Sequence, residues 1–293
     1  MEEVATKILC DRHCHLGEGS NYDAATDTAW WVDILDRHLL QADLASGKVS
    51  VHELPVMPSM VAFIDGAHQL LAAEDGLYIR NVSDNSLTLH TALEADNAKT
   101  RSNDGRVHPC GALWIGTMGR NAEPGAGAIY RFHRGELSRL YAGISVPNAI
   151  CFSLDGTTAY FTDSHEGILY RVAVDPLTAT PIGEPAALYD HRGQAGSLDG
   201  AVVDANGLIW NARWGGRCID AYTREGSRVR TIRVPAHQPS CPVFVGRNLD
   251  RLLVTSAHEG MDEQAKVADP HHGRTFVLDV GAVGRAEPRV RLS

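Results

Sequence analysis

The stretch that decides the fold is Asn206-Gly207-Leu208-Ile209-Trp210-Asn211-Ala212, followed by Gly216-Arg217-Cys218-Ile219-Asp220-Ala221-Tyr222. A polar turn precedes a short apolar and aromatic run, and a second turn precedes a second run of the same kind. Short runs of this composition, bounded by turn residues, predict two neighbouring β-strands. Helical periodicity is scarce in the rest of the chain.

The same pattern of paired runs recurs along the whole chain. Its units are marked by Trp30, Leu71, Trp114, Tyr160, Trp210 and Leu253. They are spaced by roughly 40–50 residues, which is the period of a four-stranded propeller blade. A blade cannot bury both faces of its sheet alone, so blades stack radially around a central channel.

These units account for nearly all of the 293 residues. We therefore expect residues 1–293 to form a single all-β domain, a six-bladed β-propeller with four-stranded antiparallel blades. The run Val4-Ala5-Thr6-Lys7-Ile8-Leu9 belongs to no unit. We expect it to pair as the outer strand of the last blade, which would remove an exposed sheet edge.

Composition narrows the class of protein. Hydrophobic residues make up 44% and charged residues 22% of the chain, as in ordinary soluble globular proteins. The net charge of −9 argues against nucleic acid or an anionic membrane surface as the main partner. No segment has the apolar length of a membrane span.

The N-terminus begins Met1-Glu2-Glu3-Val4, with acids where a signal peptide needs basic and then apolar residues. We therefore expect a cytoplasmic protein, in which the six cysteines are reduced thiols. The oligomeric state is open.

Polar side chains precede several of the apolar runs. Arg101-Ser102-Asn103-Asp104-Gly105-Arg106-Val107 places a guanidinium, an amide and a carboxylate together, although an isolated Asn-Asp-Gly is also a good turn. Glu18 lies between two glycines, and Asn148 and Asp199 each precede an apolar run. Asn148 and Asp199 could each be turn residues, whereas Glu18 between its glycines is harder to explain in this way. If they meet, two carboxylates and an amide oxygen would form a hard-oxygen site for Ca²⁺, Mg²⁺, Mn²⁺ or Zn²⁺.

The polar motifs follow one another in a specific order. They are Leu16-Gly17-Glu18-Gly19, Arg101-Ser102-Asn103-Asp104-Gly105-Arg106, Gly116-Thr117-Met118, Pro147-Asn148, Leu198-Asp199-Gly200, Trp214-Gly215-Gly216-Arg217 and Leu253-Val254-Thr255-Ser256-Ala257. This set resembles, in order and over essentially the full chain, the landmarks of the SMP-30/gluconolactonase family. That family includes regucalcin, sugar lactonases and luciferin-regenerating enzyme.

The resemblance implies that Glu18, Asn148 and Asp199 bind one divalent metal. It implies that Arg101 and Asn103 hold substrate oxygens, with Asn103 also near the metal. The implied activity is metal-dependent hydrolysis of a sugar (aldono) lactone such as gluconolactone to the aldonic acid. In such a reaction the metal would polarise the lactone carbonyl, and Asp199 is the candidate general base.

Two further residues and one loop segment are less settled by the resemblance. Glu123 resembles a family acid that contacts the sugar. Asp104 matches the family motif, but its role could be structural. After Gly19 the family usually shows proline and an aromatic residue, whereas this chain has Ser20-Asn21-Tyr22.

Other functions stay open at this stage. They are a regucalcin-like calcium-binding regulatory protein without turnover, a hydrolase of another ester or phosphotriester, and a propeller that serves only as an interaction platform. Cys10, His13, Cys14 and His15 could suggest zinc, but a strand would point Cys14 and His15 to opposite faces. His258-Glu259-Gly260 lacks the second histidine of a zinc protease motif. Whether His258 contacts substrate is open.

Overall fold

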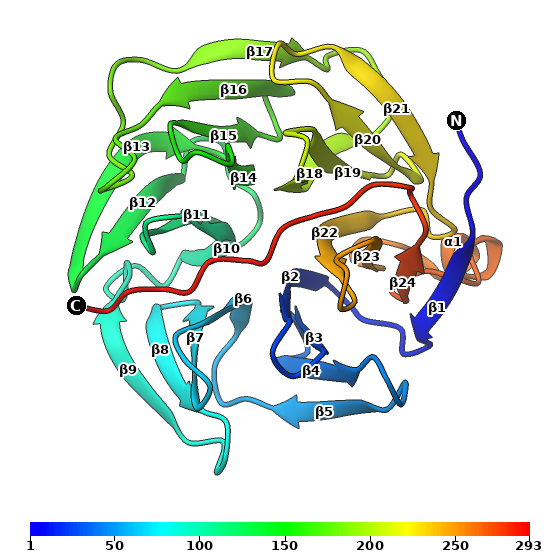
Figure 1. Cartoon of the computed structure of the whole chain (residues 1–293), viewed down its shortest axis with the longest axis horizontal. Helices are drawn as coiled ribbons and strands as arrows, with labels where there is room; N and C mark the ends of the chain where they lie inside the picture. Colours follow the sequence, from blue (N-terminus) through cyan, green and yellow to red (C-terminus); the bar gives the residue numbers. More distant parts are fainter. The chain divides into compact units, whose positions relative to one another are not determined.

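The computed structural model describes residues 1–293 and places nearly all regular structure in β-strands. The strands form six four-stranded antiparallel sheets, which are the blades of a six-bladed β-propeller fold, as predicted. By its internal contacts the chain divides into two compact units. Unit 1 comprises Met1–Met57 and Gly193–Ala286, and unit 2 comprises Pro58–Arg192 and Glu287–Ser293. Each unit contains three of the sheets (Figure 1).

Unit 1 is built from the two ends of the chain. Its sheets are β2 (Gly17–Asp23), β3 (Thr28–Asp33), β4 (His38–Asp43) and β5 (Val49–Glu53); β18 (Ser197–Val203), β19 (Ile209–Trp214), β20 (Cys218–Tyr222) and β21 (Arg228–Arg233); and β22 (Pro239–Val245), β23 (Arg251–Ser256), β24 (Thr275–Leu278) and β1 (Thr6–Cys10). The N-terminal strand β1 is the outer strand of the last sheet, with Thr6 opposite Leu278, which confirms the prediction for this run. Within unit 1, β22 lies beside both β2 and β18.

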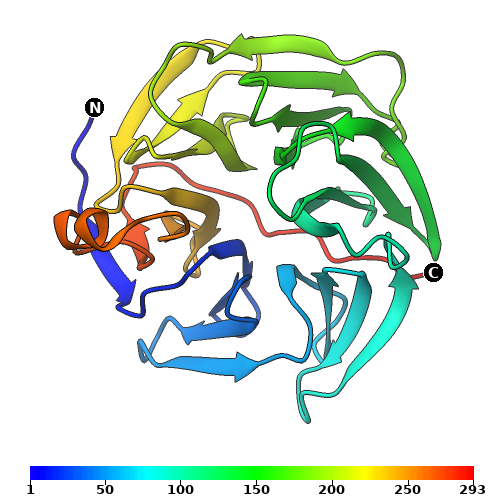
Figure 2. The same ribbon diagram turned by 180° about the vertical axis from the view of Figure 1, so that it is seen from behind.

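A short helix, α1 (Glu263–Ala268), follows β23 in unit 1 (Figure 2). The side chain of Asp262 caps it by accepting the backbone N–H of Ala265 at 2.8 Å. The sequence pattern does not predict this helix, because the segment is too short to show helical periodicity. Its only sequence signal is the acid that caps it.

Unit 2 holds the central part of the chain. Its sheets are β6 (Pro58–Phe63), β7 (His68–Ala73), β8 (Gly76–Asn81) and β9 (Leu87–Ala92); β10 (Thr100–Val107), β11 (Leu113–Gly119), β12 (Gly127–His133) and β13 (Glu136–Ile144); and β14 (Pro147–Phe152), β15 (Thr158–Asp163), β16 (Ile168–Ala173) and β17 (Ala186–Asp190). Within unit 2, β10 lies beside both β6 and β14. The motif around Asn103 is therefore part of a strand rather than a turn between strands.

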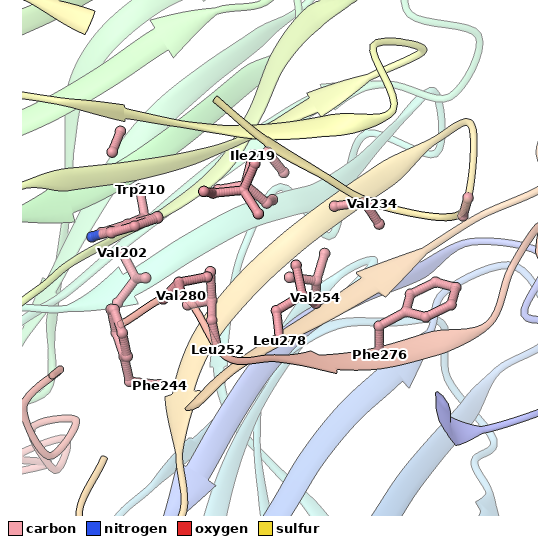
Figure 3. Packing of buried hydrophobic residues seen from close by; sticks show 14 residues of the cluster. Val202, Trp210, Ile219, Val234, Phe244, Leu252, Val254, Phe276, Leu278 and Val280 are labelled. Carbon is pink, nitrogen blue, oxygen red and sulfur yellow. The ribbon is translucent and has the colours of Figure 1, made fainter. Parts of the chain in front are cut away.

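The predicted repeat markers all fall in the second strand of a sheet, and these second strands are almost completely buried. Apolar side chains pack between neighbouring sheets of one unit, as Figure 3 shows for Trp210 of β19 and Phe244 of β22. Their rings meet edge to face, with centroids 6.2 Å apart. Burial of a large apolar side chain stabilises the fold by about 1.5–3 kcal/mol.

Strands β2 and β14 are buried along almost their whole length although they contain Glu18 and Asn148. Buried polar groups are costly unless they are hydrogen-bonded or bind a ligand, so these positions require an explanation. None of the helices is long and apolar enough to cross a membrane. All six cysteines are free, and Cys110 alone among them is only partly buried.

Candidate active site

The first strand of every sheet carries a β-bulge close to its N-terminal end. The pairing register shifts directly after Glu18 in β2 and after Asn148 in β14. Asn103 in β10 and Asp199 in β18 lie inside the corresponding shifts, and β6 and β22 show the same irregularity. A bulge disrupts the ladder locally and re-aims side chains. Four of the predicted site residues therefore occupy the same kind of backbone feature.

In unit 2 the structure brings three predicted residues together. Arg101 donates from Nη1 to Asn103 Oδ1 at 2.9 Å. Asn103 donates from Nδ2 to Asn148 Oδ1 at 3.1 Å and to the carbonyl oxygen of Pro147 at 3.0 Å. Asn148 in turn donates from Nδ2 to Ser164 Oγ at 3.0 Å. A guanidinium and two amides thus form one continuous hydrogen-bonded chain between β10 and β14.

Asp104 has a structural position in the same bulge. Its Oδ2 accepts the backbone N–H of Ile150 at 2.9 Å, which ties the bulge of β10 to the bulge of β14. Burial raises the pKa of Asp104, and the nearby Arg106 opposes this effect. Arg106 also forms a buried ion pair with Glu287, with 3.3 Å between Nη1 and Oε1. This hydrogen bond between the two bulges agrees with a structural role for Asp104.

In unit 1 the structure buries both predicted carboxylates. Glu18 is 9% exposed and Asp199 is 5% exposed. Glu18 Oε2 accepts the N–H of Gly19 at 3.1 Å. Asn211 donates from Nδ2 to the backbone carbonyl oxygens of Asp199, at 2.6 Å, and Gly200, at 3.2 Å. Asn211 therefore fixes the bulged backbone that carries Asp199, a role that the sequence did not reveal.

The loop before β18 is held by a different group. Arg213 donates from Nη2 to the carbonyl oxygen of Ala195 at 2.5 Å. Its Nη1 lies 2.6 Å from Asp220 Oδ2, and both side chains are almost completely buried. A buried ion pair of this kind is costly to break because the remaining charge loses its partner. Arg213 and Asp220 thus support the segment that leads into the Asp199 strand.

Glu123 lies in the exposed loop between β11 and β12. Its carboxylate accepts the backbone N–H of Asn121 at 3.1 Å and the side-chain N–H of the same residue at 3.0 Å. The side-chain hydrogen bond is the main cause that lowers the pKa of Glu123. A Cβ added to Gly119 would lie 2.1 Å from Glu123 Oε2, so the carboxylate sits directly over this glycine. Gly119 pairs with Thr100, the residue before Arg101, and a contact of Glu123 with substrate stays a prediction.

Three side chains that the sequence reasoning did not identify gather in unit 1. Asp33, Asp36 and His38 each offer a potential metal-ligand atom within 4.8 Å of the others. Both oxygens of Asp33 already accept backbone N–H groups, and Arg12 Nη2 lies 3.1 Å from His38 Nδ1. Because an arginine can only donate, that nitrogen of His38 is an acceptor. We assign this group to the support of the loop before β2 rather than to a metal.

Histidines that the sequence left unassigned form a second cluster in unit 1. The rings of His15 and His258 stack with centroids 5.0 Å apart, and His258 meets His272 edge to face at 5.2 Å. His258 donates its backbone N–H to the carbonyl oxygen of His15. Burial, with the neighbouring histidines, lowers the pKa of both His258 and His272. Cys14 is fully buried in an apolar cluster, so the zinc site weighed for Cys10, His13, Cys14 and His15 has no support.

Comparisons with known proteins identify relatives over nearly the full chain. Residues 16–258 match the SMP-30/Gluconolactonase/LRE-like region. A Rhizobium meliloti protein named for sugar lactone lactonase activity is 50% identical over 98% of this chain and 97% of its own length. The L-arabinolactonase of Azospirillum brasilense is 32% identical over 96% of this chain and 94% of its own length.

A crystal structure gives the same result for the fold. The calcium-binding protein regucalcin from Agrobacterium tumefaciens superposes with a TM-score of 0.98 and is 49% identical, over 99% of this chain and 98% of that one. The match thus extends over nearly the whole of both chains. The chain belongs to the SMP-30/gluconolactonase/LRE-like family.

Proposed function

We propose that this chain is a hydrolase that opens a sugar lactone with water to give the corresponding aldonic acid. Two relatives with 50% and 32% identity over nearly the full chain carry lactonase names, which supports a hydrolase of cyclic esters. The observation that carries the proposal is the hydrogen-bonded chain from Arg101 through Asn103 to Asn148. It joins residues suited to a polyol to a residue suited to a cation.

Glu18, Asn148 and Asp199 are the proposed ligands of one divalent ion. The chemistry of these donors fits such an ion, because two carboxylates and an amide oxygen are the hard ligands that Ca²⁺, Mg²⁺ and Mn²⁺ prefer, and Zn²⁺ also accepts them. Glu18 and Asp199 are at most 9% exposed, so an ion held by them would be largely shielded from bulk water. Asn148 Oδ1 accepts one hydrogen bond from Asn103 and retains a second lone pair for a ligand bond.

When held by Glu18, Asn148 and Asp199, such an ion would supply Lewis acidity at the lactone carbonyl. Arg101 and Asn103 hydrogen-bond the oxygens of the sugar and orient the ester carbon. Asp199 takes a proton from the water that attacks this carbon. The bond between that carbon and the ring oxygen then breaks, and the ring oxygen leaves as a hydroxyl with the proton from Asp199.

A calcium-binding role without turnover is the second candidate, and the name of the regucalcin relative is the observation that favours it. Ion binding alone needs no guanidinium and amide beside the ligands. The presence of Arg101 and Asn103 next to Asn148 therefore favours the enzyme. Hydrolysis of another ester or of a phosphotriester is a third possibility on the same residues.

A substrate panel separates these functions. Proton release would be followed with D-glucono-1,5-lactone, L-arabinono-1,4-lactone, an acyclic phenyl ester and a phosphotriester, each with Ca²⁺ or Mn²⁺ present. We expect turnover of at least one sugar lactone, and a loss of about 100-fold or more in Asp199→Asn, as for the removal of a catalytic base. The matched control is Asp204→Asn, because Asp204 is a buried acid that follows the other end of the same strand. Calcium binding without turnover of any lactone would overturn the proposal in favour of the regulatory role.

A further inference from the structure

The bulges of β2 and β14 differ from those of β10 and β18 in their backbone conformation. Directly after Glu18, Gly19 has a φ of 56°, and directly after Asn148, Ala149 has a φ of 54°. Asn103 and Asp199 are not followed by left-handed residues. A left-handed conformation costs a residue with a side chain about 1–2 kcal/mol, so the surroundings of Ala149 must enforce it.

An aspartate holds the backbone that leads into β2. Asp33 is the last residue of β3, is fully buried and pairs with Gly17. Its Oδ2 accepts the N–H of His15 at 2.9 Å, and its Oδ1 accepts the N–H of Leu16 at 3.0 Å. One carboxylate thus binds the two backbone N–H groups immediately before the strand. The next residue after Gly17 is the proposed ligand Glu18.

The same arrangement occurs in unit 2. Asp163 is the last residue of β15, is 3% exposed and pairs with Pro147. Its Oδ2 accepts the N–H of Ser145 at 2.7 Å, and its Oδ1 accepts the N–H of Val146 at 3.1 Å. Asn148 again follows the paired residue. Two sheets in different units therefore use one carboxylate in one position for the same pair of contacts.

The sheets of Asn103 and Asp199 lack this aspartate. The corresponding position is the second-to-last residue pair before the register shift. In β11 this position holds Met118, which pairs with Arg101. In β19 it holds Trp214, which pairs with Ser197. The aspartate is therefore found with the left-handed bulge and is absent where the bulge has ordinary backbone angles. This correlation links the carboxylate to the conformation of the bulge rather than to strand pairing in general.

From this geometry we propose that Asp33 and Asp163 are positioning residues, which hold Glu18 and Asn148 in the orientation that binds the ion. The proposal rests on the proposed function, in which these two residues are ligands. Neither aspartate touches the substrate, since its oxygens are occupied by backbone N–H groups. Each acts through the backbone, by fixing two successive peptide groups so that the bulge begins at one place. Groups that orient metal ligands typically change metal affinity by about 10–100-fold when they are removed.

The test uses Asp33→Asn and Asp163→Asn in the full-length protein. Asparagine has almost the same shape but keeps one acceptor oxygen, and its amide N–H₂ faces a backbone N–H that needs an acceptor. Asp204→Asn is the control, because Asp204 is also fully buried and accepts the N–H groups of Asn206 and Leu208. It lies at the far end of β18, away from the bulge.

Two quantities decide the outcome: the Kd for Ca²⁺ or Mn²⁺ measured by calorimetry, and amide hydrogen exchange of peptides covering residues 13–21 and 145–151. We expect the Kd to rise about 10-fold or more in Asp33→Asn and Asp163→Asn, together with faster exchange of the peptide that each aspartate holds. Asp204→Asn should lose stability yet keep the wild-type Kd. If an asparagine variant does not fold, Asp33→Ser or Asp163→Ser, in which a hydroxyl with water replaces the carboxylate, is measured in its place.

Three outcomes would overturn the inference. A wild-type Kd in folded Asp33 and Asp163 variants would show that these two carboxylates do not position the ligands. An equal loss of affinity in Asp204→Asn would show a general effect of stability. A raised Kd with unchanged exchange would show that only the loss of charge matters. Wild-type protein that binds no divalent ion would instead remove the proposed function, and the inference with it, a result visible before any variant is made.

Discussion

Asn103 donates its side-chain amide to the side-chain oxygen of Asn148 at 3.1 Å, across 45 residues of sequence. This bond connects a residue proposed to hold the sugar with a residue proposed to hold the ion. The amide that donates this bond belongs to a bulge of β10 and not to a surface turn, which agrees with the burial of the polar motif in this strand. The two asparagines should therefore act as a unit.

Asn103→Ala removes two donated hydrogen bonds and the acceptor for Arg101. We expect kcat/KM for the lactone to fall about 10- to 100-fold, since both the orientation of the sugar and that of Asn148 are lost. The free energy of unfolding should fall by only about 1 kcal/mol. Steady-state kinetics measures kcat/KM, and urea unfolding measures the free energy of unfolding. Asn206→Ala, at an exposed turn, is the control, and equal kinetics in the two variants would contradict the role of Asn103.

Arg101→Lys keeps the positive charge but removes the planar guanidinium, whose Nη1 donates to both Ser102 O and Asn103 Oδ1 at 2.9 Å. Lysine is not equivalent to arginine where two acceptors are bridged. We expect KM to rise about 10-fold, as for the loss of one charge-assisted hydrogen bond, with a smaller change in kcat. The control Arg120→Lys, on the neighbouring loop, should leave KM unchanged. An unchanged KM in Arg101→Lys would show that Arg101 does not hold substrate.

Gly119→Ala tests Glu123 without changing its charge. The added Cβ would lie 2.1 Å from Glu123 Oε2, so the carboxylate must move. If Glu123 contacts the sugar, Gly119→Ala and Glu123→Gln should both raise KM several-fold, by an amount typical of one lost hydrogen bond. Glu136→Gln, at the start of β13, is the control. Wild-type KM in both variants would remove Glu123 from the site.

The histidine cluster predicts how stability depends on pH. The pKa values of His258 and His272 are lowered in the folded protein, mainly by burial. Between the folded and the unfolded pKa the unfolded state binds more protons, so stability rises with pH in that window. We therefore expect Tm to fall as the pH is lowered from about 7.5 towards about 5, through the ordinary histidine range.

His258→Gln and His272→Gln, which cannot be protonated, should each flatten this dependence. His90→Gln, at an exposed position of β9, should leave it unchanged. Thermal unfolding followed at several pH values provides the measurement. A slope that is the same in all four proteins would contradict the account.

The repeat of paired runs was sufficient to predict the fold, because Trp114 and Trp210 recur at blade spacing and both proved fully buried. The pairing of the N-terminal run with the last sheet was also predictable from its lack of a partner. The family followed from the order of the polar motifs. The roles of Glu18, Asn148 and Asp199 stay predictions, as do a cytoplasmic location, a single domain and the contact of Glu123 with substrate.

Other features could not be predicted because they depend on register rather than on composition. A bulge is one extra residue in a strand, and no residue type marks it. Asp33 and Asp163 look like turn acids in the sequence, since each ends an apolar run. Their carboxylates bind backbone N–H groups 17 and 18 residues away, a relation that only the paired strands reveal.

The most direct test of the central claim is proton release from D-glucono-1,5-lactone above the spontaneous rate, measured during metal reconstitution. Chelator-stripped protein would be titrated with Ca²⁺, Mg²⁺, Mn²⁺ or Zn²⁺, beside Asp199→Ala treated in the same way. We predict no turnover in the stripped protein, full recovery with about one equivalent of an active ion, as for a single-ion site, and none in Asp199→Ala. Full turnover in the stripped protein, or in Asp199→Ala, would contradict a lactonase that depends on one ion held by Glu18, Asn148 and Asp199.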